Sequence, residues 1–140
     1  MPLTLDDKQA IAELAARYNF ALDHFRIEEW ADTFTDDGEL RTGDKTQCKG
    51  RSIRIAFLEQ ARAKGHRSRH WACNLLIEGD GDVARLRMYV LSIAINDGIR
   101  PYIIGEYDDT LVKVNGEWRF QLRHVSVVTG TPFNAGAAMS

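Results

Sequence analysis

Long apolar runs, clustered basic charge and cysteine are all scarce in this chain of 140 residues. No run approaches the roughly 18 apolar residues that a membrane-spanning helix needs, so we expect no membrane association. The basic residues are scattered and the formal net charge is −2, which argues against a surface that binds nucleic acid. The opening residues, MPLTLDDKQA, show no basic segment followed by an apolar one, and we therefore expect a cytoplasmic protein.

Motifs for metals and cofactors are also lacking. Cys48 and Cys73 cannot form a zinc site alone and give no disulfide framework, so both are expected to be free thiols. His66 and His70 are expected to straddle a loop, and no acidic ligand accompanies them as in the zinc-binding helix motif. The turn sequence GDGD opens no helix that could hold a phosphate, and no nucleophile elbow occurs. We expect neither a metal nor a cofactor.

The first half of the chain shows the apolar spacing of helices, in a composition that is 44% apolar and 27% charged, as in ordinary globular domains. A helix is predicted over residues 5–24, with Thr4 and Asp7 as its cap, and a short one from Ile27. A third helix is predicted within RSIRIAFLEQARAKG, with Ser52 as a possible cap. The intervening GELRTGD is a short strand or a connector.

After Gly65 the apolar period changes from that of a helix to that of a strand. Strands are predicted over 70–78, 82–96, 102–114 and 117–128, and the turn sequences between them indicate antiparallel pairing. Two of these runs are long, so a bulge or a bend is expected. Helices followed by such a meander predict an α+β fold in which a curved sheet wraps the helices into a cone with an open end. We expect one domain over 1–128 and a flexible tail over 129–140.

His70 begins the first of these strands, and its role depends on which face of the strand is buried. His70 shares a face with Ala72 and Asn74, whereas the opposite face is more apolar, so alternation alone leaves His70 facing solvent. A sheet used on both faces would bury both sets, and the sequence leaves this open. A histidine acts as a general base only when a carboxylate orients it, and Asp23 at the end of the first helix is the candidate.

Other polar and aromatic residues have two readings each. Tyr18 is either a core side chain or an acid that contacts the substrate, and it lies about 140° around the helix from Asp23. Alternation on the last strand places His124 toward the apolar interior and Arg123 on the other face, where a surface or interface ion pair is expected. Asn74, His124 and Trp30 are our candidates for substrate contact.

Three segments together carry a family resemblance. They are ARYNFALDHFRIEEWADTFTDDGEL, RSRHWACNLLIEGDGDVARLRMYVL and GEYDDTLVKVNGEWRFQLRHVSV. Their markers are R-Y-x4-D, W-x3-F-x-x-D-G, R-H-x3-N and N-G-x-W-R. With these markers the chain resembles the nuclear-transport-factor-2-like superfamily, in particular its scytalone dehydratase and SnoaL-like polyketide cyclase branch.

The resemblance implies a cystatin-like cone of three helices and a strongly bent antiparallel sheet, usually dimeric through the outer face of the sheet. In cofactor-free lyases of this branch, such as scytalone dehydratase and hexachlorocyclohexane dehydrochlorinase, a helix aspartate and a strand histidine form a dyad in the pocket. Asp23 and His70 match those positions. Relatives that dehydrate steroids carry a tyrosine where Tyr18 stands.

The chain is also similar to the small subunit of aromatic-ring-hydroxylating dioxygenases, which implies a scaffold for a large catalytic subunit. Three functions therefore stay open. The leading hypothesis is a lyase or isomerase that acts on a small apolar cyclic substrate through His70, Asp23 and Tyr18. The others are a non-catalytic subunit and a small-ligand-binding domain without chemistry. A homodimer or higher homo-oligomer is expected under all three.

Overall fold

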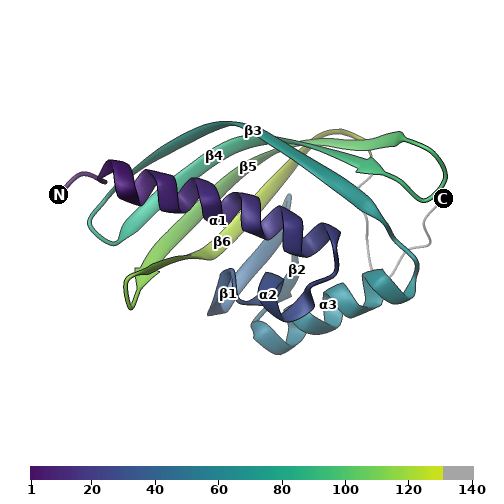
Figure 1. The fold of residues 1–140 in the computed structure, drawn as a ribbon, viewed down its shortest axis with the longest axis horizontal. Coiled ribbons are helices and arrows are strands. Elements are labelled where there is room, and N and C mark those ends of the chain that lie inside the picture. The colour runs from purple at the N-terminus through teal and green to yellow at the C-terminus, as the bar shows by residue number, and fades with distance from the viewer. Residues whose placement is uncertain (131–140) are drawn as a thin grey trace.

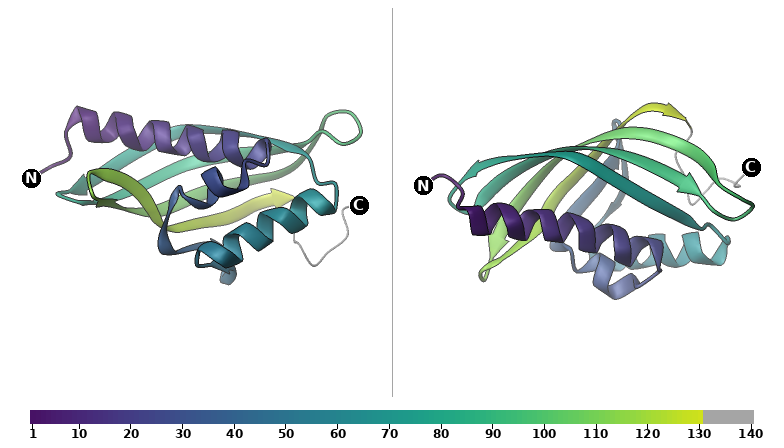
Figure 2. Two further views of the ribbon diagram at one scale, coloured as in Figure 1. Left: turned by 60° about the horizontal axis from the view of Figure 1, so that its bottom comes forward. Right: turned by 45° about the horizontal axis from the view of Figure 1, so that its top comes forward.

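Three helices lie against one curved sheet in the computed structural model, which describes residues 1–130 (Figure 1). The helices are α1 (Leu5–Asp23), α2 (Ile27–Ala31) and α3 (Arg51–Ala63). α1 runs across one face of the sheet, and α2 and α3 lie together beside β1 and β2 (Figure 2). The predicted α+β class is confirmed.

The sheet has six strands in the order β2-β1-β6-β5-β4-β3. The strands are β1 (Phe34–Thr42), β2 (Lys45–Lys49), β3 (Ser68–Asp80), β4 (Val83–Ala94), β5 (Arg100–Val114) and β6 (Glu117–Gly130). All neighbouring pairs are antiparallel except β1 and β6, which are parallel. The segment predicted as a strand or connector is therefore part of a hairpin. Of the tail predicted over 129–140, the first two residues belong to β6 and the rest lie outside the described residues.

The start of α1 is fixed by the predicted cap. The Asp7 N–H donates to Thr4 Oγ1 at 3.0 Å, and the Asp7 carboxylate accepts from the Thr4 N–H at 3.1 Å. The same carboxylate accepts from Lys113 Nζ and Trp118 Nε1, each at 3.1 Å. These hydrogen bonds, that from the Thr4 backbone first, hold the pKa of Asp7 well below its usual range. One carboxylate thus caps the helix and ties it to the β5–β6 hairpin.

The third helix begins differently from the prediction. Its cap is Gly50, whose φ of +89° suits glycine, and not Ser52. Ile53 is 54% exposed, whereas Arg54 is buried and donates to the carbonyl groups of Ala31, Thr35 and Gly38. The helix therefore turns a guanidinium inward, because the chain around β1 presents carbonyl oxygens there that need donors.

A bulge in β3 overturns the simple alternation of faces. Between Cys73 and Leu76 the strand advances three residues while β4 advances only two, from Tyr89 to Arg87. Asn74 lies in this bulge with a φ of +60°, a conformation that asparagine tolerates better than most residues. One extra residue moves every later side chain to the opposite face.

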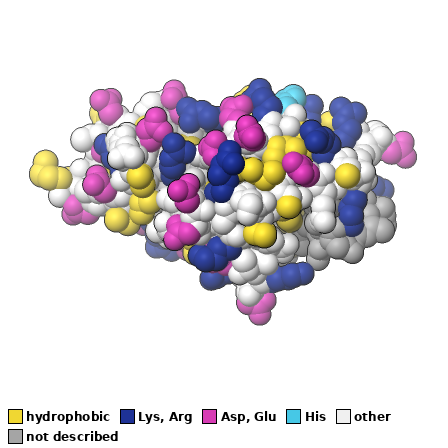
Figure 3. Space-filling view, turned by 90° about the horizontal axis from the view of Figure 1, so that it is seen from below, with side chains coloured by type: hydrophobic (Ala, Val, Ile, Leu, Met, Phe, Trp, Pro, Cys, Tyr) yellow, Lys and Arg dark blue, Asp and Glu magenta, His cyan; other side chains and the backbone are white. Residues whose placement is uncertain are grey.

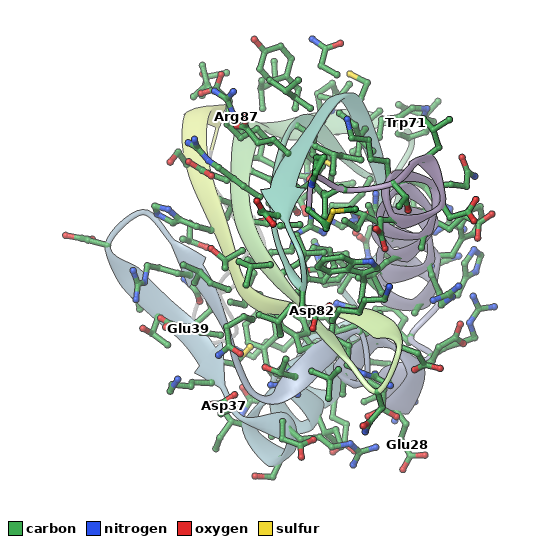
Figure 4. The ribbon with its side chains drawn as sticks, turned by 90° about the vertical axis from the view of Figure 1, so that its left-hand side faces the viewer. Glu28, Asp37, Glu39, Trp71, Asp82 and Arg87 are labelled. Carbon is green, nitrogen blue, oxygen red and sulfur yellow. The ribbon has the colours of Figure 1, made fainter. Side chains whose placement is uncertain are left out.

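The buried face of β3 consequently changes along the strand. Ser68, His70 and Ala72 face the helices before the bulge, and Ile77 packs against the core after it. Trp71 points outward and is 57% exposed (Figure 4). The expectation that alternation leaves His70 facing solvent is therefore wrong for this strand.

A bulge in β6 also exchanges the inward and outward faces of its strand. Phe120 and Leu122 pair with neighbouring residues of β5, so β6 carries one extra residue between them. The inward set changes from Phe120 to Arg123 and Val125, all buried. His124 thus faces away from the core and Arg123 enters it, the reverse of the predicted placement, because the bulge shifts the pleat by one residue.

Candidate active site

A cavity lies between α1, α2, α3 and the concave face of the sheet. Its volume is about 110 Å³, somewhat below the roughly 150 Å³ of a protein cavity that holds one benzene ring. Its walls are mostly apolar, with Leu22, Phe57, Leu58, Val90 and Val125 among them. An apolar pocket with a few polar groups is the usual form of a small-molecule site.

Several polar side chains line the cavity besides His70. Tyr18, Tyr102 and Tyr107 line it together with Ser92. His70 and Ser92 are cross-strand neighbours on β3 and β4, so their side chains lie side by side on the concave face. The cavity therefore offers a possible base and several hydroxyl groups in one apolar space.

Asp23 and His70 form a tight pair at the edge of this cavity. Asp23 Oδ1 lies 2.5 Å from His70 Nδ1, and Asp23 Oδ2 accepts the His70 backbone N–H at 3.0 Å. The side chains are only 7% and 11% exposed, respectively. His70 lines the cavity, and Asp23 contacts both its ring and its backbone N–H, at the positions that the resemblance pairs.

The pair forms because of where α1 ends. Asp23 is the last residue of α1, and β3 is an edge strand, so within residues 1–130 no strand pairs with its outer backbone N–H groups. One carboxylate can therefore accept both the backbone and the ring N–H of His70. The helical-wheel separation of Asp23 from Tyr18 is no obstacle, because Asp23 contacts the edge strand while Tyr18 faces the sheet.

Protonated hydroxyl groups face the same space. Burial raises the pKa of Tyr102 to about 12, and it raises the pKa of Tyr18 and of Tyr107 as well. All three phenols are therefore hydrogen-bond donors at neutral pH. Tyr18 also packs against Trp30, with ring centroids 5.8 Å apart. Trp30 lines the cavity, where a residue that contacts the substrate must lie.

His66 is a second histidine of the cavity, which the sequence suggested only as a metal ligand to be discounted. Its Nε2 lies 3.4 Å from the Tyr102 hydroxyl, and the two rings meet edge to face. Burial, and secondly the neighbouring His70, lower the pKa of His66 to about 4. His66 is therefore neutral at pH 7. The apolar alternation that follows Gly65 does not indicate that His66 faces a cavity.

Two candidate substrate contacts lie elsewhere. Asn74 is exposed at the β3 bulge and lines a depression on the outer face of the sheet. His124 Nε2 lies 2.7 Å from the Gly43 carbonyl oxygen, at the β1–β2 turn. The structure thus brings Tyr18, Asp23, Trp30 and His70 together and leaves Asn74 and His124 outside the cavity.

Other classes of site find little support in the described part of the chain. Residues 1–130 hold no group of three or more histidine, cysteine or acidic side chains that could bind a metal. Within the same range, no helix is long and apolar enough to cross a membrane. Charged side chains of both signs are interspersed over the face in Figure 3. Cys48 is buried and Cys73 exposed, and both are free thiols.

Comparison with known proteins gives the family. A model of the SnoaL-like domain matches residues 3–124. A protein of unknown function with a cystatin-like fold from Nostoc punctiforme is 30% identical, over 94% of this chain and 98% of that chain, with a TM-score of 0.83. A proposed scytalone dehydratase from Novosphingobium aromaticivorans is 29% identical, over 96% and 92%, with a TM-score of 0.82.

A third structure shows likeness of fold alone. The β subunit of a proposed aromatic-ring-hydroxylating dioxygenase from Novosphingobium aromaticivorans is 24% identical, over 86% of this chain and 88% of that chain, with a TM-score of 0.74. No curated protein matches the chain. The family model covers most of the sequence, and the structural neighbours share its cystatin-like, nuclear-transport-factor-2-like fold. The chain belongs to the SnoaL-like domain family.

Proposed function

We propose that this protein is a cofactor-independent lyase or isomerase that acts on a small, largely apolar cyclic carbonyl compound. The observation that carries the proposal is the Asp23–His70 pair, 2.5 Å apart, with His70 at the wall of an apolar cavity. The similarity to a proposed scytalone dehydratase supports the same class of reaction. The cavity volume of about 110 Å³ favours a substrate of about one ring.

The dyad assigns the two nitrogen atoms of His70 different tasks. With its proton on Nδ1, His70 donates to Asp23 and keeps the Nε2 lone pair free to accept a proton. His70 then removes a proton from a carbon next to the substrate carbonyl, or from the vinylogous position. The carboxylate of Asp23 stabilises the imidazolium that forms.

The remaining steps use hydroxyl groups of the cavity. Tyr18 donates a hydrogen bond to the carbonyl oxygen, which receives the electron pair of the broken C–H bond as an enolate. In an isomerisation the imidazolium returns its proton to another carbon. In a dehydration the enolate electrons expel a hydroxyl group from the β carbon, and this group leaves as water with the proton from His70. Neutral His66 adds no positive charge that would compete with protonation of His70.

The direct test is proton exchange in deuterated water. A panel of cyclic ketones and cyclic hydroxy-ketones is incubated with the protein, and deuterium incorporation at carbon is followed by NMR. General base catalysis typically supplies about 10²–10⁴-fold, so His70→Ala should slow exchange by at least about 10²-fold. His124→Ala, a histidine outside the cavity, is the matched control and should exchange normally. Full exchange by a folded His70→Ala variant would refute the dyad.

A second candidate is a non-catalytic subunit of a larger oxygenase assembly. The fold shared with the dioxygenase β subunit supports it. A scaffold has no need of an oriented histidine at a cavity wall, so we favour the lyase or isomerase. The scaffold predicts a stable complex with a larger chain when the protein is purified from its source cell, and the enzyme predicts turnover by the purified chain alone.

A further inference from the structure

A buried cation lies directly behind two of the cavity tyrosines. Arg123 is 0% exposed, and its guanidinium carbon lies 3.8 Å from the ring centroid of Tyr107 and 4.4 Å from that of Tyr18. The same guanidinium carbon lies 4.3 Å from the ring centroid of Phe120. Tyr18 and Tyr107 also line the cavity, whereas Arg123 does not. A guanidinium stacked on aromatic rings at these distances makes strong cation–π contacts when it is desolvated.

The counterion of Arg123 is Asp109, which does not line the cavity. Asp109 Oδ2 accepts from Arg123 Nε at 3.1 Å and from Nη2 at 2.8 Å. Asp109 is two residues beyond the cavity-lining Tyr107 on β5 and is itself fully buried. The guanidinium stacks directly on both tyrosine rings, and Asp109 is bonded to its Nε and Nη2 atoms, so of the two charges the positive one is in contact with the rings.

The groups that face Arg123 are few. Tyr18 faces it from α1, Tyr107 and Asp109 face it from β5, and the uncharged sulfur of Met88 faces it from β4 at 3.9 Å. Burial raises the pKa of Asp109 to about 6, although Arg123 opposes this, so the carboxylate is ionised above neutral pH. The titratable groups on the cavity side are His66, His70 and Tyr102.

We propose that Arg123 makes the Tyr18–Tyr107 end of the cavity a subsite for a negatively charged oxygen of the phenolate or enolate type. This inference rests on the proposed function and names its ligand class. A cation behind a phenol ring strengthens the hydroxyl as a donor, and inside an apolar cavity its field is weakly screened. Arg123 acts through the tyrosines and is a positioning residue.

The subsite also selects among substrates. Removal of a proton by His70 places the negative charge on a carbonyl oxygen, which is the charge that this end of the cavity favours. Compounds that lose a proton next to a carbonyl are therefore substrates of the right class. An aromatic alcohol in its ionised form mimics the enolate and should bind more tightly than its neutral form.

The test uses p-nitrophenol, because its ionised form absorbs visible light and its neutral form does not. The probe is titrated with the wild-type protein across the neutral pH range, and the ionisation constant of bound probe is compared with that of free probe. Burial raises the pKa of Tyr18 and of Tyr107 themselves, but a bound phenolate would accept hydrogen bonds from both of their hydroxyl groups in addition to the field of Arg123. We therefore expect bound p-nitrophenol to ionise at least about tenfold more readily, a fall of one unit in its pKa. Equal ionisation of bound and free probe would overturn the inference.

His70→Ala separates this inference from the proposed function. If the bound probe ionises as readily in His70→Ala, the anion preference comes from the tyrosine and arginine end. If the preference disappears, the probe had passed its proton to His70. The second outcome supports the dyad and overturns the role of Arg123, and it needs no change in the core.

Removal of the ion pair provides the direct test. The double variant Arg123→Met with Asp109→Leu replaces a buried pair by apolar side chains, a change that folded proteins often tolerate. Its control is Arg85→Met with Asp108→Leu, an exposed pair whose atoms also lie 2.8 Å apart. The core variant should lose about tenfold in phenolate preference and the control none. A folded core variant that keeps the full preference would overturn the inference.

Discussion

Replacement of Asp23 by asparagine should move the proton of His70 to the wrong nitrogen. Asp23 accepts the His70 backbone N–H at 3.0 Å with one oxygen and faces Nδ1 at 2.5 Å with the other. In Asp23→Asn only the amide oxygen can accept the backbone N–H, so the amide NH₂ must face Nδ1. His70 must then accept at Nδ1 and carry its proton on Nε2. The proposed reaction instead needs a free lone pair on Nε2 to accept the substrate proton.

The size of the effect follows from these contacts. Loss of a positioned general base costs typically about 10²–10⁴-fold in rate, and we expect deuterium exchange to fall within that range. Because the side chains are 7% and 11% exposed, loss of the charged acceptor should also cost about 2 kcal/mol of unfolding free energy. Urea denaturation measures the second quantity.

The assay that decides is ¹⁵N NMR of the histidine side chains, because it reports which ring nitrogen carries the proton and needs no substrate. The wild type should show the Nδ1–H tautomer at His70 and the variant the Nε2–H tautomer. His124→Ala assigns the signal of a histidine outside the cavity. If His70 keeps its proton on Nδ1 in Asp23→Asn, or if exchange falls less than about tenfold, the tautomer argument is wrong.

Three further predictions concern stability and assembly. The pKa of His66 falls from 6.5 to about 4 on folding, so its stabilising contribution, present above pH 6.5, is lost as the pH falls through 4. Over that range the wild type should lose about 3 kcal/mol more than His66→Gln in urea denaturation, and equal losses would contradict the shift. Asn74→Val should cost about 1–2 kcal/mol at its positive φ and Asn74→Gly almost nothing, and equal costs would show that the bulge conformation is unimportant. The resemblance implies a dimer through the outer face of the sheet, where Trp71 is 57% exposed. We therefore propose that Trp71→Lys weakens self-association at least about tenfold in analytical ultracentrifugation, and a monomeric wild type or an unchanged dissociation constant would contradict this.

Local patterns in the sequence predict most of the elements correctly. The cap at Thr4, the helix that ends beside Asp23 and the four long strands all depend on neighbours within a few residues of the chain. Capping, apolar period and turn composition are local properties, so a single sequence carries them. The resemblance added the pairing of Asp23 with His70, which joins residues 47 positions apart.

The faces of β3 and β6 could not be predicted in this way. A bulge needs only one extra residue, and neither Asn74 in β3 nor the Phe120–Leu122 segment in β6 shows from its sequence that pairing with the next strand slips. As a result, alternation alone places His70 and Arg123 outward and His124 inward, whereas the structure puts each on the opposite face. For His70 the sequence pattern leaves the face open, and only the family resemblance assigns it to the pocket.

Local sequence patterns are enough to predict the α+β class, the cap of the first helix, the turns and the residue types available for a general base. Which of these residues come into contact depends on the tertiary structure. The edge position of β3 lets one carboxylate accept both N–H groups of His70, and the bulge in β6 inserts Arg123 behind Tyr18 and Tyr107. Both depend on how strands pair across the sheet, and strand register is a relation between distant segments that no local pattern specifies.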